Sequence, residues 1–115
     1  MSGGNYTGVA TDNINPAVIQ MQGSGSTKIT RMYVIRQTLT PAQVAAATTV
    51  EQTFTVPGLQ VGDAVDINKA SHQTGLSIGN VRVSAANTLA IQFVNTTSAT
   101  PITPASEVYI IGGMA

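Results

Sequence analysis

The sequence predicts an all-β protein, a single antiparallel β-sandwich preceded by an extended N-terminal arm. Three observations predict it. Apolar and polar residues alternate with a period of two over most of residues 28–115, the segments between these runs are rich in Gly and Pro, and no segment has a long helical pattern. With 115 residues, the chain fits one domain.

The predicted arm covers residues 1–27, where Gly, Ser, Asn and Thr dominate and "QGSGST" resembles a flexible linker. One apolar patch interrupts it, "NPAVIQM". This patch either packs on its own domain as a short strand or turn, or docks on a partner. The candidate partner-contact residues are Val18, Ile19 and Met21.

The sandwich domain is predicted over residues 28–115, and its first strand over "KITRMYVIRQTLT", residues 28–40. The side chains expected on one side of this strand are Ile29, Tyr33, Ile35 and Leu39. The next segment, "PAQVAAATT" at residues 41–49, has Pro at an early position followed by Ala. That order predicts a short helical turn.

Two further strands follow. Residues 50–56, "VEQTFTV", place Val50, Phe54 and Val56 on one face and polar residues on the other. After the turn-forming pairs Pro-Gly and Gly-Asp of residues 57–63, "AVDIN" points Val65 and Ile67 inward. Residues 69–80, "KASHQTGLSIGN", are predicted to be a loop.

The clearest hairpin is "VRVSAANTLAIQFVN", residues 81–95, with its turn at Ala86-Asn87. The side chains expected to face inward are Val81, Val83, Leu89, Ile91 and Phe93. A loop with two Pro residues then leads to a last strand, "SEVYIIGG". Six strands at short spacing are typical of an immunoglobulin-like or jelly-roll-like sandwich, or of a partly closed barrel.

Charge is scarce. Five basic and five acidic side chains make up 9% of the chain, against about 25% in ordinary soluble proteins. Polarity comes instead from Thr, Ser, Asn and Gln, which total 39 of the 115 residues. The longest uncharged stretch, residues 83–106, is therefore predicted to stay hydrated through hydroxyls and amides and to pack against neighbouring molecules.

Composition also argues against nucleic-acid and membrane partners. Lys28, Arg31 and Arg36 are close in sequence, but a strand would divide them between its two faces, whereas a phosphate backbone needs clustered cations. No stretch approaches the roughly 20 apolar residues that span a bilayer. The N-terminus lacks the pattern of a signal peptide, so we expect the chain to stay in the cytoplasm where it is made. Export without such a signal stays open.

Catalytic and metal-binding patterns are weak. The chain has no Cys, and its one histidine, His72, is expected in an exposed loop, with no Ser in a G-x-S-x-G turn. Asp63, Asp66 and Asn68 are either partial calcium ligands or ordinary turn and strand residues. "GSGST" lacks phosphate-loop spacing. We expect no enzyme activity, cofactor, metal or small-molecule substrate.

Residues 53–109 resemble a module of small virion proteins of tailed bacteriophages. The segments that carry the resemblance are "TFTVPGLQVGD", "VDINKASHQTGLSIGNVRVSAANTLAIQFVN" and "ITPASEVY", with Ala70 where a Pro would be expected. The resemblance implies a β-sandwich and a structural role in the virion as a capsid decoration or cement protein or a head fibre. The implied partners are the major capsid protein and copies of this chain. The alternative is a tail- or fibre-associated module that binds a receptor on the host surface.

Overall fold

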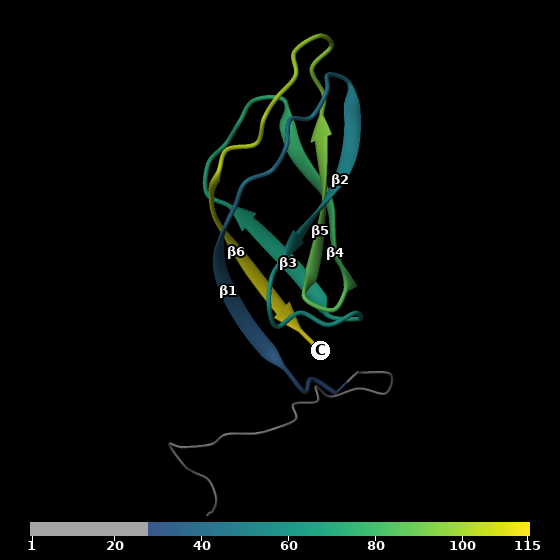
Figure 1. Cartoon of the computed structure of the whole chain (residues 1–115), viewed down its shortest axis with the longest axis vertical. Coiled ribbons are helices and arrows are strands. Elements are labelled where there is room, and N and C mark those ends of the chain that lie inside the picture. Colours follow the sequence, from purple (N-terminus) through teal and green to yellow (C-terminus); the bar gives the residue numbers. More distant parts are fainter. Residues whose placement is uncertain (1–27) are drawn as a thin grey trace, which may run out of the picture. The chain divides into compact units, whose positions relative to one another are not determined.

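The structure, a computed structural model, describes residues 28–115. It contains six β-strands (Figure 1). Their bounds are β1 Met32–Leu39, β2 Thr48–Thr55, β3 Ala64–Lys69, β4 Leu76–Ala85, β5 Thr88–Asn95 and β6 Glu107–Met114. The arm predicted for residues 1–27 lies outside the described residues.

The strands form two three-stranded antiparallel sheets, in the orders β1-β6-β3 and β2-β5-β4. These sheets pack on each other as a sandwich, so the prediction of an antiparallel β-sandwich is confirmed. Only β4 and β5 are joined by a tight hairpin, because the four other connections between the strands all cross from one sheet to the other.

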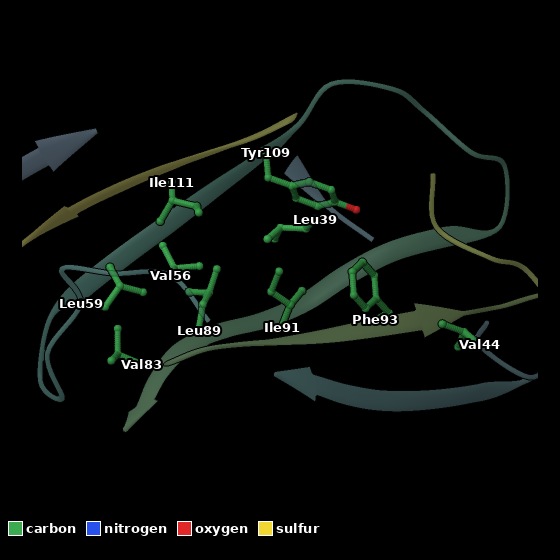
Figure 2. Close-up of a cluster of buried hydrophobic side chains, with 10 residues drawn as sticks. All are labelled: Leu39, Val44, Val56, Leu59, Val83, Leu89, Ile91, Phe93, Tyr109 and Ile111. Atoms are coloured by element: carbon green, nitrogen blue, oxygen red, sulfur yellow. The ribbon is translucent and has the colours of Figure 1, made fainter. Parts of the chain in front are cut away.

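The core lies between the two central strands, β6 and β5 (Figure 2). Tyr109 and Ile111 on β6 face Ile91 and Phe93 on β5, and all four are fully buried. Further buried side chains complete the cluster: Leu39, Val44, Val56, Leu59, Val83 and Leu89. The predicted inward positions Leu39, Val56, Val83, Leu89, Ile91 and Phe93 are thereby confirmed, since period two sends alternate residues to one face.

The predicted hairpin is confirmed with its turn at Ala86-Asn87. Asn87 has a φ of 57°, a left-handed conformation that Asn tolerates better than most residues. Its side-chain Oδ1 also accepts a hydrogen bond of 2.8 Å from the Gly58 backbone N–H. The turn is thus tied to the segment between β2 and β3.

The short helical turn predicted for residues 41–49 is wrong. Val44 is fully buried and exchanges two backbone hydrogen bonds with Ile102, of 2.7 and 2.9 Å. The chain then turns through Ala47, at a φ of 52°, and enters β2 at Thr48. Burial of Val44 and its bridge to Ile102 outweigh the helical preference of three consecutive Ala residues.

Two strand details also differ from the prediction. β4 begins at Leu76, so the expected loop over residues 69–80 shrinks to residues 70–75. Ile29 lies outside β1, which begins at Met32, opposite Met114 at the end of β6. Val50 lies on the predicted face, opposite the buried Phe93, and keeps 36% of its surface exposed on the edge strand β2.

Part of the uncharged stretch is internal, whereas residues 85–87 and 98–101 are exposed, so its packing against neighbouring molecules stays a prediction. β5 is the central strand of its sheet, and five of its eight residues are buried. Charge is absent there because its own fold covers the strand.

Candidate functional site

The most exposed apolar surface is the side of the β1-β6-β3 sheet that points away from the core. We call it the apolar face; its residues are Met32, Val34, Arg36, Thr38, Ala64, Asp66, Asn68, Val108, Ile110, Gly112 and Met114. Six large apolar side chains are exposed in the described part of the chain, and four of them, Met32, Val34, Val108 and Met114, lie on this face. Their exposed fractions run from 41% to 62%.

The apolar face arises from strands that are apolar on both sides. In β6, Tyr109 and Ile111 are buried in the core, while Val108 and Ile110 alternate with them and point outward. Only two charged side chains stand on the face, Arg36 on β1 and Asp66 on β3. Contiguous exposed apolar surface of this kind marks an interaction site.

A depression of about 650 Å³ lies over the β6 end of this face. Gly112 forms its floor, with Val34 on one side and Asp66 on the other. A Cβ placed on Gly112 would meet no heavy atom within 4 Å. The face therefore has a hollow at its central strand, and Met32 and Met114 border it.

The opposite exterior, on the β2-β5-β4 sheet, is polar. Thr49, Thr53 and Thr55 point outward from β2, and Glu51 beside them forms a bidentate ion pair with Arg82 on β4, with both N–O distances 2.8 Å. Arg82 holds the pKa of Glu51 below its usual value. The two outer surfaces of the sandwich thus differ in character, and the apolar one is the candidate interaction site.

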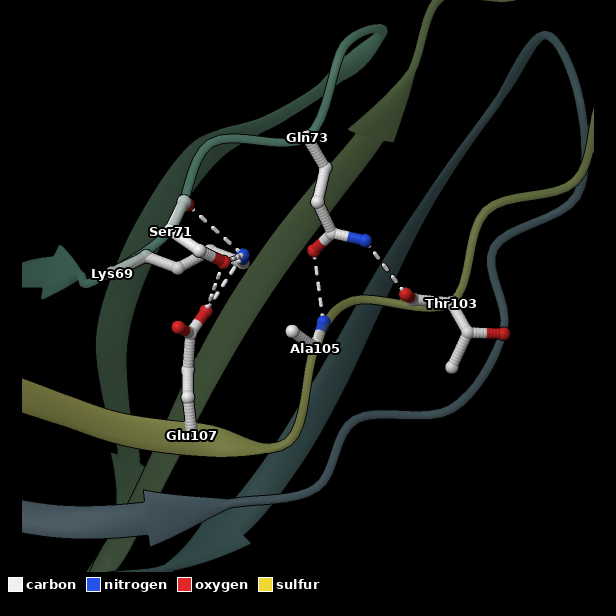
Figure 3. Close-up of polar contacts among 6 residues, drawn as sticks. All are labelled: Lys69, Ser71, Gln73, Thr103, Ala105 and Glu107. Carbon is white, nitrogen blue, oxygen red and sulfur yellow. Dashed lines mark hydrogen bonds and ion pairs between the residues drawn. The ribbon is translucent and has the colours of Figure 1, made fainter.

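One polar cluster has the residue types of a nucleophile and a base (Figure 3). Ser71 Oγ donates to Glu107 Oε2 at 2.9 Å and lies 3.1 Å from Lys69 Nζ, which forms an ion pair of 2.7 Å with the same carboxylate. The hydrogen bond from Lys69 lowers the pKa of Glu107, so this carboxylate is a poor base towards the serine hydroxyl.

This cluster instead ties the loop of residues 70–75 to the start of β6. Gln73 continues the connection, since its side-chain amide donates to the Thr103 carbonyl at 2.9 Å and accepts from the Ala105 N–H at 2.8 Å (Figure 3). We call these contacts the polar clip. It holds the crossing from β3 to β4 against the segment that leads into β6.

Within residues 28–115, the structure does not bring the site residues predicted from the sequence together at one place. Val18, Ile19 and Met21 lie outside the described residues. His72 is exposed in the loop between β3 and β4, as expected. Asp63 accepts the Tyr33 hydroxyl at 2.6 Å in a turn, whereas Asp66 and Asn68 stand on the apolar face, so the three do not form one site.

Residues 28–115 contain no group of three His, Cys, Asp or Glu side chains that could hold a metal ion. Nor do they contain a helix of the length and hydropathy needed to cross a membrane.

Sequence reasoning missed the apolar face and the polar clip. The face was hidden because alternation does not say which of two apolar sides points outward. Its signal was present in β6, where five consecutive residues lack any polar side chain. Comparison of the chain with protein-family models, curated proteins and solved structures gives no match.

Proposed function

We propose that this protein is a non-enzymatic structural protein of a bacteriophage virion, which decorates or cements the capsid by binding the major capsid protein. The observation that carries the proposal is the apolar face, since four exposed large apolar side chains on one sheet of a small sandwich are expected in a protein that works in an assembly, where a neighbouring subunit covers them. The resemblance of residues 53–109 to phage virion modules is the reason for proposing that the assembly is a phage virion.

The low charge of the chain supports a role in an assembly. Burying a charged group at an interface carries a desolvation cost, whereas hydroxyls, amides and apolar groups can be covered with much less. Two of the few charges in the sandwich are already engaged in the pair between Glu51 and Arg82, and two more in the polar clip. The remaining exterior offers large areas that a neighbouring subunit can cover at little electrostatic cost.

The test is the copy number in purified particles. A decoration protein occupies equivalent positions over the shell, so gel densitometry or quantitative mass spectrometry should find roughly hundreds of copies per virion. About a dozen copies or fewer would favour the alternative, a tail- or fibre-associated module that binds the host surface. Absence from particles would overturn both.

Reconstitution provides the second arm of the test. Purified protein should bind particles that lack it, at saturable sites, and fail to bind particles already decorated. Catalytic turnover would point instead to an enzyme, and His72→Ala offers a control, because that exposed side chain should be dispensable.

A further inference from the structure

We propose that the apolar face is the interface of a homodimer, in which a second copy of this chain docks the same face across a two-fold axis. The occupant is inferred from the pattern on the face itself. It carries one cation and one anion, Arg36 and Asp66, on opposite edge strands, so it has no net charge to attract a charged partner. Instead, the face of one copy is complementary in shape and polarity to the same face of a second copy, as an interface between two identical chains requires.

The shape match lies on the central strand. Ile110 and Gly112 are successive outward positions on β6, the first a bulky side chain and the second the floor of the depression. Midway between them is Ile111, in register with Ile35 and Ile67. Consider a two-fold axis that lies in the plane between the two sheets, crosses the strands at right angles and passes the level of Ile111. It places Ile110 of each copy over Gly112 of the other.

The same axis also matches the edge strands. On β3 it sets Asp66 of one copy opposite Asn68 of the other, where the amide can donate to the carboxylate. On β1 it sets Arg36 opposite Val34, so that the aliphatic stem of Arg36 covers an apolar side chain and its charge reaches the rim. Neither charge lies directly opposite its own copy. Two sheets packed face to face with nearly aligned strands have this geometry in β-sandwiches.

The size of the face sets the strength of the dimer. An eight-residue strand spans about 26 Å and three strands are about 14 Å wide, so each copy buries roughly 400 Å². Interfaces below about 1,200 Å² in total belong to weak complexes. The dimer should therefore be in concentration-dependent equilibrium with the monomer.

Sedimentation equilibrium of the full chain, over about a hundredfold range of concentration, tests the proposal. The unaltered protein should dimerise reversibly. Gly112→Leu should raise the dissociation constant by about tenfold or more, because the new side chain fills the hollow that receives Ile110. The fold should tolerate it, since nothing lies within 4 Å of the added Cβ. Ile110→Gly combined with Gly112→Ile exchanges the two shapes without changing composition and should restore dimerisation.

A matched pair of charge substitutions separates the face from the rest of the surface. Val108→Glu places a carboxylate opposite Met114 of the other copy and should also weaken the dimer by about tenfold or more. Val61→Glu changes a valine that is still more exposed, 68% against 46% for Val108, in the turn before β3 and outside the face, and should leave the equilibrium unchanged. The melting temperature of each variant checks that its fold is retained.

Four results would overturn the proposal. These are a monomer at every concentration, as expected if another part of the chain covers the face; a dimer indifferent to Val108→Glu; equal weakening by Val61→Glu; and a stronger dimer for Gly112→Leu, the sign of unspecific apolar contact. The inference stands apart from the virion role, because the measurement uses purified protein without particles. A monomer would leave the capsid proposal standing, and absence from virions would leave the dimer standing.

Discussion

At the scale of single residues, Asn95 is the one buried polar side chain of the described residues. Its amide nitrogen donates to the carbonyls of Val44 and Thr100, at 3.1 and 2.9 Å, and its oxygen accepts the Thr97 N–H at 2.9 Å. In the sequence it is the last residue of the predicted hairpin and directly precedes a run of Thr and Ser, and nothing there marks it as buried. Only the fold, which brings Val44 beside the end of β5, gives it these partners.

Asn95→Ala should therefore destabilise the domain by about 1–3 kcal/mol, because it leaves the Thr97 N–H without its acceptor and removes both bonds of the buried amide nitrogen. Chemical denaturation monitored by circular dichroism measures the change. Asn80→Ala is the control, since Asn80 is exposed on β4 and its replacement should alter the free energy of unfolding by less than about 0.5 kcal/mol. Equal effects would show that the Asn95 network contributes nothing specific.

Tyr109 presents the opposite situation, because its hydroxyl is buried with no hydrogen-bond partner in the described part of the chain. Tyr109→Phe removes an unsatisfied group while keeping the ring, so the free energy of unfolding should stay equal or rise by up to about 1–2 kcal/mol. Thermal denaturation provides the comparison. A loss of more than about 1 kcal/mol would mean that the hydroxyl has a partner after all.

The same side chain predicts a dependence on pH. Burial, together with the charge of Glu107, raises the pKa of Tyr109 from 10.0 to about 12. The unfolded chain therefore loses this proton first, and stability should fall as pH rises from about 10 to about 12. In Tyr109→Phe this part of the alkaline loss should disappear, as measured by denaturation at a series of pH values. An unchanged pH profile would contradict the assignment.

At the scale of elements, the six strands and the hairpin at Ala86-Asn87 could be predicted because alternation and turn chemistry are local. The wrong predictions concern segments whose conformation depends on contacts with residues distant in the sequence. Residues 41–47 have helical composition, but burial of Val44 and its bridge to Ile102 hold them extended. The start of β4 at Leu76 was missed because Gly79 sits at a β-bulge, which breaks the period-two pattern.

The two glycines of β6 make a matched test of the sheet's two sides. Gly113 points into the sandwich, where an added Cβ would overlap the ring of Tyr33, whose hydroxyl is held by Asp63. Gly113→Ala should cost about 1–3 kcal/mol through overpacking. Gly112→Ala points into open space and should be neutral or slightly stabilising, since Ala loses less backbone entropy than Gly.

Urea denaturation of both variants measures this difference. If the two substitutions cost the same, the assignment of inner and outer sides on β6 is wrong, and the apolar face and the proposed dimer fall with it.

At the scale of the whole molecule, a sandwich with one polar and one apolar exterior is the feature that sequence reasoning did not find. Low charge favours association, and the longest uncharged stretch is residues 83–106. This stretch contains β5, and most of β5 is buried inside the fold. The exposed apolar side chains come mainly from β1 and β6, which are far apart in sequence and adjacent only after folding. Which surface is apolar is thus set by topology, and composition alone shows only that charge is scarce.

The last prediction concerns residues 1–27, which we expect to act as a docking arm through Val18, Ile19 and Met21. Burying an apolar side chain of this size contributes roughly 1.5–3 kcal/mol, so three of them can offset part of the entropy lost when an arm becomes ordered on a partner. A chain beginning at Lys28 keeps all six strands and the core cluster. It should therefore melt at nearly the same temperature, dimerise through the apolar face as before, and bind undecorated capsids far more weakly than the full chain. Differential scanning fluorimetry measures the melting temperature, sedimentation equilibrium the dimer, and co-sedimentation the binding to capsids. Unfolding of the shortened chain would make residues 1–27 part of the core, and undiminished capsid binding would place the contact on the sandwich itself.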